Sequence, residues 1–133
     1  MAGRLTVSTL NNDTGPLAVQ NGMTGVAKAW VVFAGATGTI NGSFNVGSVT
    51  RNGTGDYTVN FSTPMSNANY SAIGNAGIDT PASAYQIVYP NSTGTSPFYQ
   101  AATTTACRFV TAGGVSSANL RDALLINFAV FGI

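Results

Sequence analysis

The stretch that decides the fold is FNVGSVTRNGTGDYTVNF, residues 44–61. Its second half, Asp56–Phe61, alternates strictly between polar and apolar residues, as a strand with one buried face does. Tyr57, Val59 and Phe61 then point to one side, where we expect them to be buried. The neighbouring sequence is equally rich in Thr, Val, Asn and Gly, so the stretch predicts an all-β fold.

The first half of this stretch predicts the partner strand and the turn. Phe44, Val46 and Val49 are typical of a strand, which we expect to bend near Gly47. The Asn52-Gly53 pair is a strong signal for a two-residue hairpin turn, because both residues accept a positive φ. We therefore expect an antiparallel hairpin with its turn in Arg51–Gly55, where the Asn52-Gly53 pair fixes the register.

Apolar runs on either side of the hairpin predict further strands. Lys28–Phe33 carries apolar residues on both faces, which indicates a central strand or a strand at a subunit seam. Gly35–Gly42 is typical of a loop. Other strands are expected at Tyr70–Gly74, Tyr85–Tyr89, Ala106–Val110 and Leu124–Phe131. Short strands at this spacing predict an all-β, antiparallel β-sandwich of the jelly-roll-like kind.

The beginning of the chain differs from the rest. Turn formers dominate Asn11–Pro16, and Asn21-Gly22 adds another turn signal. We expect residues 1–26 to form an extended N-terminal arm that anchors the protein to a neighbouring subunit or to another protein. Residues 27–133 are expected to form the β-sandwich domain.

The composition excludes several kinds of function. Charged residues make up 7% of the 133 residues, the net charge is +1, and there is no His. So small a charge predicts no binding to nucleic acid, and no apolar run is long enough to insert into a membrane. Without His, a Ser-His-acid triad is impossible and the commonest metal ligand is missing. The lone Cys107 is expected to be a buried, inert thiol.

The few charged residues offer weak candidates for catalysis. A Ser-Lys dyad would need Lys28, which instead opens a strand beside Trp30. Paired carboxylates could cleave a glycosidic bond in principle, but Asp56 lies beside a turn, where Asp usually bonds nearby groups. The acids are Asp13, Asp56, Asp79 and Asp122. We therefore expect no enzymatic activity, no catalytic residue, no cofactor and no metal.

Aromatic side chains provide the remaining candidates for a site. Their flat faces could stack on sugar rings, although core and subunit contacts explain most of them equally well. The set comprises Tyr70, Tyr85, Tyr89, Phe98 and Tyr99. Phe98 and Tyr99 lie in a polar loop and are the least well explained as core, so we expect any ligand contact there.

Three parts of the chain together resemble a known family. They are GVAKAWVVF (25–33), the stretch from Ile40 to Tyr70 that contains the hairpin, and INFAVFG (126–132). They are similar to a module of tailed-bacteriophage virion structural proteins, often found at the C-terminal end of tail fibres. The resemblance covers residues 25–75 and the last strand, and it leaves residues 76–122 without a recognised motif.

This resemblance implies a β-rich, trimeric structural module with no enzymatic activity and no cofactor. Because the arm is short, a tail-fibre or related tail-appendage subunit with host-surface contact fits better than a complete fibre. The alternatives are a capsid decoration or cement protein on the phage head and a carbohydrate-binding receptor tip that contacts a host surface glycan. The expected location is the virion, assembled in the host cytoplasm. A homotrimer is also expected from the sparse charge and the apolar segments Trp30–Phe33 and Leu124–Ile133.

Overall fold

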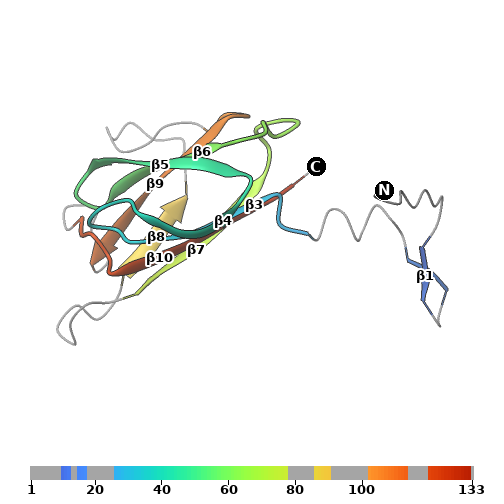
Figure 1. The fold of residues 1–133 in the computed structure, drawn as a ribbon, viewed down its shortest axis with the longest axis horizontal. Coiled ribbons are helices and arrows are strands. Elements are labelled where there is room, and N and C mark those ends of the chain that lie inside the picture. Colours follow the sequence, from blue (N-terminus) through green and yellow to red (C-terminus); the bar gives the residue numbers. More distant parts are fainter. Residues whose placement is uncertain are drawn as a thin grey trace, which may run out of the picture.

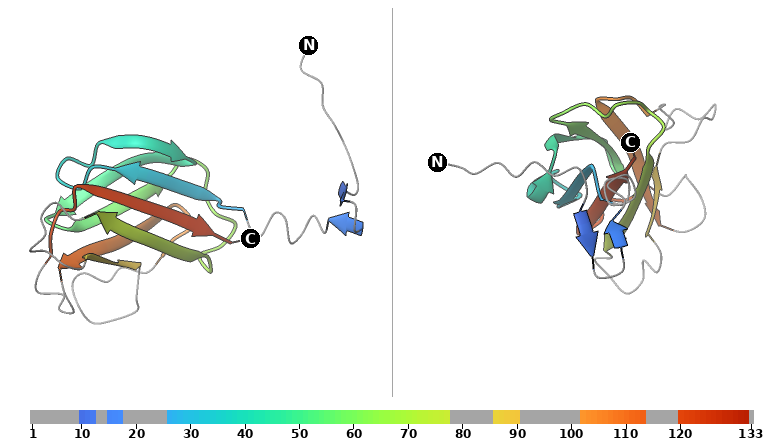
Figure 2. Two further views of the ribbon diagram at one scale, coloured as in Figure 1. Left: turned by 90° about the horizontal axis from the view of Figure 1, so that it is seen from below. Right: turned by 90° about the vertical axis from the view of Figure 1, so that its right-hand side faces the viewer.

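The computed structural model describes residues 10–12, 15–17, 26–77, 86–90, 102–113 and 120–132. All of the strands in these residues pair antiparallel, which confirms the predicted all-β fold. Figures 1 and 2 show two sheets that face each other as a sandwich. The fold class predicted from the sequence is therefore correct.

Each of the two sheets has four strands. The first sheet has the order β4 (Ile40–Phe44), β3 (Ala29–Phe33), β10 (Leu125–Phe131), β7 (Ser71–Gly77). The second sheet has the order β5 (Val46–Gly53), β6 (Asp56–Phe61), β9 (Ala106–Gly113), β8 (Gln86–Pro90). The edge strands β7 and β8 lie beside each other, so the sandwich is nearly closed along that side.

The core lies between the two inner faces and is built largely from aromatic rings. Phe109 of β9 stacks on Phe128 of β10, with ring centroids 4.6 Å apart, and so joins the two sheets. Phe33 meets Tyr57 edge to face at 5.2 Å. Tyr57, Val59 and Phe61 are all buried, as their alternation predicts. Burial of these side chains is the main source of stability for a domain with so little charge.

Asn45 forms the corner at which the chain passes from the first sheet to the second. It has a φ of 54°, a left-handed conformation that Asn tolerates better than most residues. Its amide donates to the carbonyl oxygens of Lys28 and Thr63, at 3.0 and 3.1 Å. The sharp change of direction thus lies at Asn45, and the ladder of β5 is also irregular between Val46 and Ser48, where a bend near Gly47 is predicted. The predicted loop Gly35–Gly42 is also too long, because β4 begins at Ile40 and pairs with β3.

The β5–β6 turn lies within the predicted segment Arg51–Gly55, but two residues beyond the Asn52-Gly53 pair that was expected to form it. Gly53 pairs with Asp56, so Thr54 and Gly55 form the turn and Asn52 lies at an irregularity in the ladder. Gly55 has a φ of 65°, whereas neither residue of the Asn52-Gly53 pair has a positive φ. The hairpin itself is confirmed, but the prediction that Asn52-Gly53 makes its turn is wrong.

The other predicted strands are present with bounds shifted by at most three residues. Lys28–Phe33 corresponds to β3, which is central because it lies between β4 and β10. Within the predicted arm, β1 (Leu10–Asn12) pairs with β2 (Gly15–Leu17) around the run of turn formers. The remainder of residues 1–25 lies outside the described residues, so the arm stays a prediction.

Candidate functional site

The structure describes only part of the aromatic set singled out in the sequence. Phe98 and Tyr99, the predicted ligand contacts, lie outside the described residues, as does Tyr85. Tyr70 is part of the core instead: its ring meets Phe61 edge to face at 5.8 Å. Its hydroxyl donates to the carbonyl oxygens of Thr103 and Ala106. Tyr70 is therefore engaged in holding the fold.

Asp56 is engaged by an arginine of the neighbouring strand. Arg108 Nε donates to Asp56 Oδ1 at 2.8 Å, and a terminal guanidinium nitrogen donates to Oδ2 at 2.5 Å. Partial burial acts to raise the pKa of Asp56, but the bonds from Arg108 and Asn52 outweigh it and hold that pKa below its usual range. Asp56 is thus an ionised partner in a bidentate pair, which indicates a structural role.

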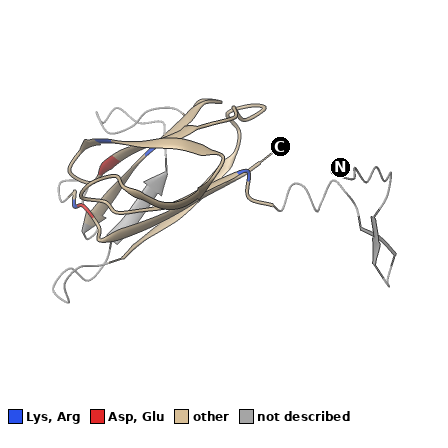
Figure 3. Cartoon of the chain, in the orientation of Figure 1, with Lys and Arg blue, Asp and Glu red and all other residues tan. Residues whose placement is uncertain are grey.

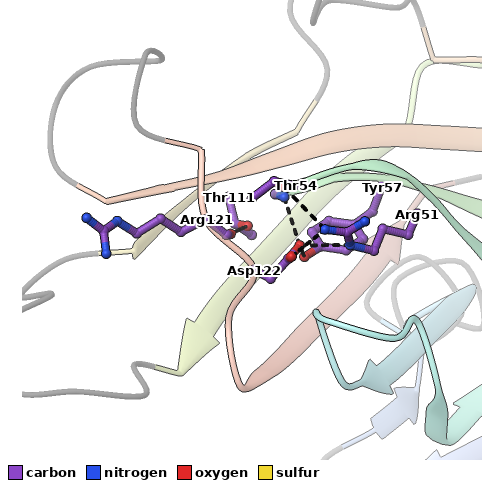
Figure 4. A network of polar contacts seen from close by, with 7 residues as sticks. Arg51, Thr54, Tyr57, Thr111, Arg121 and Asp122 are labelled. Atoms are coloured by element: carbon purple, nitrogen blue, oxygen red, sulfur yellow. Dashed lines mark hydrogen bonds and ion pairs between the residues drawn. The ribbon is translucent and has the colours of Figure 1, made fainter.

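Asp122 joins the segment before β10 to the β5–β6 turn, as Figure 4 shows. Its carboxylate accepts hydrogen bonds from the guanidinium of Arg51, from Gly55 N at 2.9 Å and from Tyr57 Oη at 2.6 Å. Burial acts to raise the pKa of Asp122, but the bonds from Arg51, Gly55 and Tyr57 outweigh it and lower that pKa. Burial, and then the contact with Asp122, raises the pKa of Tyr57, so this phenol keeps its proton.

Cys107 is the remaining candidate nucleophile among the described residues. Cys107 is buried as predicted, and burial raises its pKa to about 11, which keeps the thiol protonated at neutral pH. In the described ranges, no three residues of the types His, Cys, Asp and Glu lie close enough together to hold a metal ion. The same ranges contain no helix of the length and hydrophobicity needed to cross a membrane.

A groove runs along the outer face of the first sheet. The pairing places Trp30 of β3, Ala129 of β10 and Ile73 of β7 in one row across the sheet. Trp30 is 40% exposed and Ile73 is 56% exposed, and the small Ala129 lies between them. The open space has a volume of about 320 Å³. We call it the sheet groove.

The next row of the sheet adds amide groups to this groove. Asn127 of β10 and Asn75 of β7 are paired, and Asn127 Nδ2 donates to Asn75 Oδ1 at 2.8 Å. The indole of Trp30 reaches over β4 into this same row, since a Cβ atom on Gly42 would lie 3.5 Å from its six-membered ring and Gly42 pairs with Val32, the residue opposite Asn127. None of the described residues that line the sheet groove is charged. Figure 3 shows how few charges the described ribbon carries.

A second hollow lies at the end of the sandwich where the chain approaches β3. It has a volume of about 370 Å³ and extends from Val26 past Phe44 and Asn45 to Pro64 and Ser66. Val26 and Phe44 are more than half exposed, at 59% and 56%. We call this region the end hollow. Sequence reasoning did not find it, because it joins segments that are distant in sequence.

The comparisons with known proteins add no relative to these observations. Neither the family models nor the curated proteins nor the solved structures contain a match to this chain. The two surfaces and the residues that carry the phage resemblance are therefore the features that indicate a function.

Proposed function

We propose that the protein is a structural subunit of a bacteriophage virion, namely a tail-fibre or related tail-appendage subunit that contacts the host surface. One observation carries the proposal. The segments that resemble the phage module, residues 25–75 and 126–132, are far apart in sequence, yet they supply nearly all of the first sheet. They also supply the whole β5–β6 hairpin. The resemblance thus falls on nearly one whole sheet and on the hairpin at one edge of the other sheet.

The chemistry of the described acids favours a role without catalysis. Asp56 and Asp122 each pair with an arginine, at 2.5 Å in both cases. Both carboxylates keep a lowered pKa and serve to connect strands and turns. A general acid would need a raised pKa and access to substrate, and neither residue combines these properties. Their arrangement supports a protein that acts by assembly and binding.

We assign the contacts between subunits of a homotrimer to the end hollow. Val26 and Phe44 expose apolar surface there, next to the point where residues 1–25 join the domain. Exposed apolar surface of this kind is typical of interfaces, and closed symmetry is their usual form. Packing of three copies around this end would bring the three N-terminal arms together for attachment to another virion protein.

The proposal is tested on purified phage particles from a strain that carries the gene. Mass spectrometry of the particles should detect peptides of this chain, and immunogold labelling should place it on the tail. Labelling of the head would replace this proposal with the decoration or cement alternative. Absence of the chain from particles that contain the major capsid and tail proteins would contradict both.

A further inference from the structure

The sheet groove has the form of a small-molecule site. Its volume of about 320 Å³ lies at the lower end of the range of about 300–1,000 Å³ found for such sites. Trp30 and Ile73 stand on its two sides, with Ala129 between them. The groove thus has an aromatic side chain on one side, an aliphatic side chain on the other and a low floor between them, in a volume large enough for one sugar ring.

The amides at the groove add directional polar groups. An Asn side chain has two N–H donors and an oxygen with two lone pairs, and the bond between Asn127 and Asn75 uses one donor and one lone pair. The hydrogen bond between them fixes the position of both amides, which lie one row along the outer face from the backbone of Trp30. Together they suit a ligand with an apolar C–H face on one side and hydroxyl groups at its rim.

The absence of charge restricts the ligand further. No acidic or basic residue is found among the described residues that line the groove. An anionic ligand would lose its hydration here without gaining a charged partner, which is costly. A neutral ligand carries no charge whose hydration would be lost on binding.

The size of the sheet face argues against a second copy as the occupant. Strands of five to seven residues, rising about 3.3 Å per residue and spaced about 4.8 Å apart, give a face of roughly 300–400 Å². A stable protein interface buries about 800 Å² on each partner. The flat footprint of the sheet face is well below this accessible area, so the face suits a small ligand better than a subunit.

We propose that the sheet groove binds a neutral glycan, with a pyranose ring stacked on Trp30 and its hydroxyls hydrogen-bonded to Asn127 and Asn75. This inference rests on the proposed function, because it names a neutral glycan as the molecule that the protein contacts on the host surface. It places the glycan site on the first sheet, away from the loop that contains Phe98 and Tyr99.

Trp30 is the single tryptophan of the chain, so its fluorescence reports directly on the groove. The full-length protein is titrated with chitotriose, maltotriose and lactose to about 10 mM, with sialyllactose as the acidic comparison. We expect a saturable change in emission with at least one neutral sugar and a weaker response to the acidic one. No response to any neutral sugar, or a response to sialyllactose alone, overturns the inference.

Variants identify the groups that bind the sugar, with calorimetry as the readout because one of them lacks the indole. Asn127→Ala should weaken binding about three- to tenfold, as expected for one lost neutral hydrogen bond. Trp30→Ala should abolish measurable binding, and circular dichroism checks that it remains folded. Leu124→Ala is the matched control, because Leu124 is 68% exposed and does not line the groove. Equal affinity for Asn127→Ala, Trp30→Ala and wild type overturns the inference.

Two further outcomes separate this inference from the proposed function. If emission changes with protein concentration together with a rise in mass, and does so in Phe44→Arg as well as in the wild type, the groove is a subunit interface and the glycan site is excluded. If the chain is found in virions but no neutral sugar binds, only the glycan inference fails. If neutral sugars bind but the chain is absent from virions, the proposed function fails and the binding site remains.

Discussion

Replacing Gly55 by Ala should destabilise the protein strongly, because the turn has no space for a side chain. A Cβ atom at Gly55 would lie 2.6 Å from both Arg121 N and Thr111 O, and 2.9 Å from Arg121 O. These neighbours are backbone atoms, so the clash is relieved only by moving the segment before β10 or the end of β9. Gly55 also has a φ of 65°, which strains any residue with a Cβ.

The magnitude follows from the contacts at risk. The left-handed backbone costs an alanine roughly 1–2 kcal/mol. Moving the segments endangers the bonds Thr111 N to Gly55 O, Arg121 N to Thr111 O and Gly55 N to Asp122 Oδ1. Each contributes about 1 kcal/mol, while the stiffer unfolded chain returns less than about 1 kcal/mol. We expect the free energy of unfolding to fall by about 3–5 kcal/mol, a large part of the total for a domain of this kind.

Thermal and urea denaturation, followed by circular dichroism, measure this loss. The melting temperature of Gly55→Ala should fall by roughly 10 °C or more. Gly53→Ala is the matched control in the same hairpin, because nothing lies within 4 Å of a Cβ there and its φ is not positive. That variant should stay within about 1 kcal/mol of wild type. A larger loss for Gly53→Ala than for Gly55→Ala would refute the placement of the turn.

Three other predictions follow from the carboxylates and the surfaces. The folded-state pKa values of Asp56 and Asp122 lie below the ordinary 3.8, so their stabilisation is present above about pH 4 and is lost as the pH falls further. Tyr57→Phe should lower stability by about 1–3 kcal/mol at pH 7, and by less as the pH falls through the lowered pKa of Asp122 and this partner takes up a proton; a loss in urea denaturation that stays constant as the pH is lowered would contradict this. Light scattering should give three times the chain mass for the wild type and one chain mass for Phe44→Arg, with Thr54→Arg in the exposed β5–β6 turn as the control that stays trimeric. Deletion of residues 1–24 should leave a folded domain that no longer enters particles, and normal incorporation would show that the arm is not the anchor.

The local sequence pattern was sufficient to predict the strands in which polar and apolar residues alternate. Tyr57, Val59 and Phe61 are buried as predicted because a strand has only two faces, and three apolar residues at a spacing of two must share one. The same pattern could not identify β4, whose sequence INGSF is rich in Gly, Asn and Ser. β4 becomes a strand because its backbone pairs with β3, and Gly42 leaves room for the ring of Trp30. Tertiary contact here outweighs the weak local propensity.

The turn was misplaced for a reason that lies outside the hairpin. The sequence Arg51–Gly55 offers two glycines, and local statistics favour the one that follows Asn. The position of the turn at Gly55 is stabilised by Asp122, which accepts a hydrogen bond from Gly55 N, and by Thr111, whose backbone N donates to Gly55 O. Both partners are more than 50 residues away in sequence, so no local pattern can contain them.

The candidate site depends on the same kind of distant information. The apolar run at Lys28–Phe33 predicted that both faces of β3 would be covered, but it could not say by what. The second sheet covers Val31 and Phe33, whereas Trp30 stays 40% exposed on the other side. Which groups accompany Trp30 is decided by the register of β3, β10 and β7, which brings Ala129, Asn127 and Asn75 beside it. The residues of a binding surface on a sheet are therefore determined by how the strands pair. The sequence of one strand shows only the residues that this strand contributes.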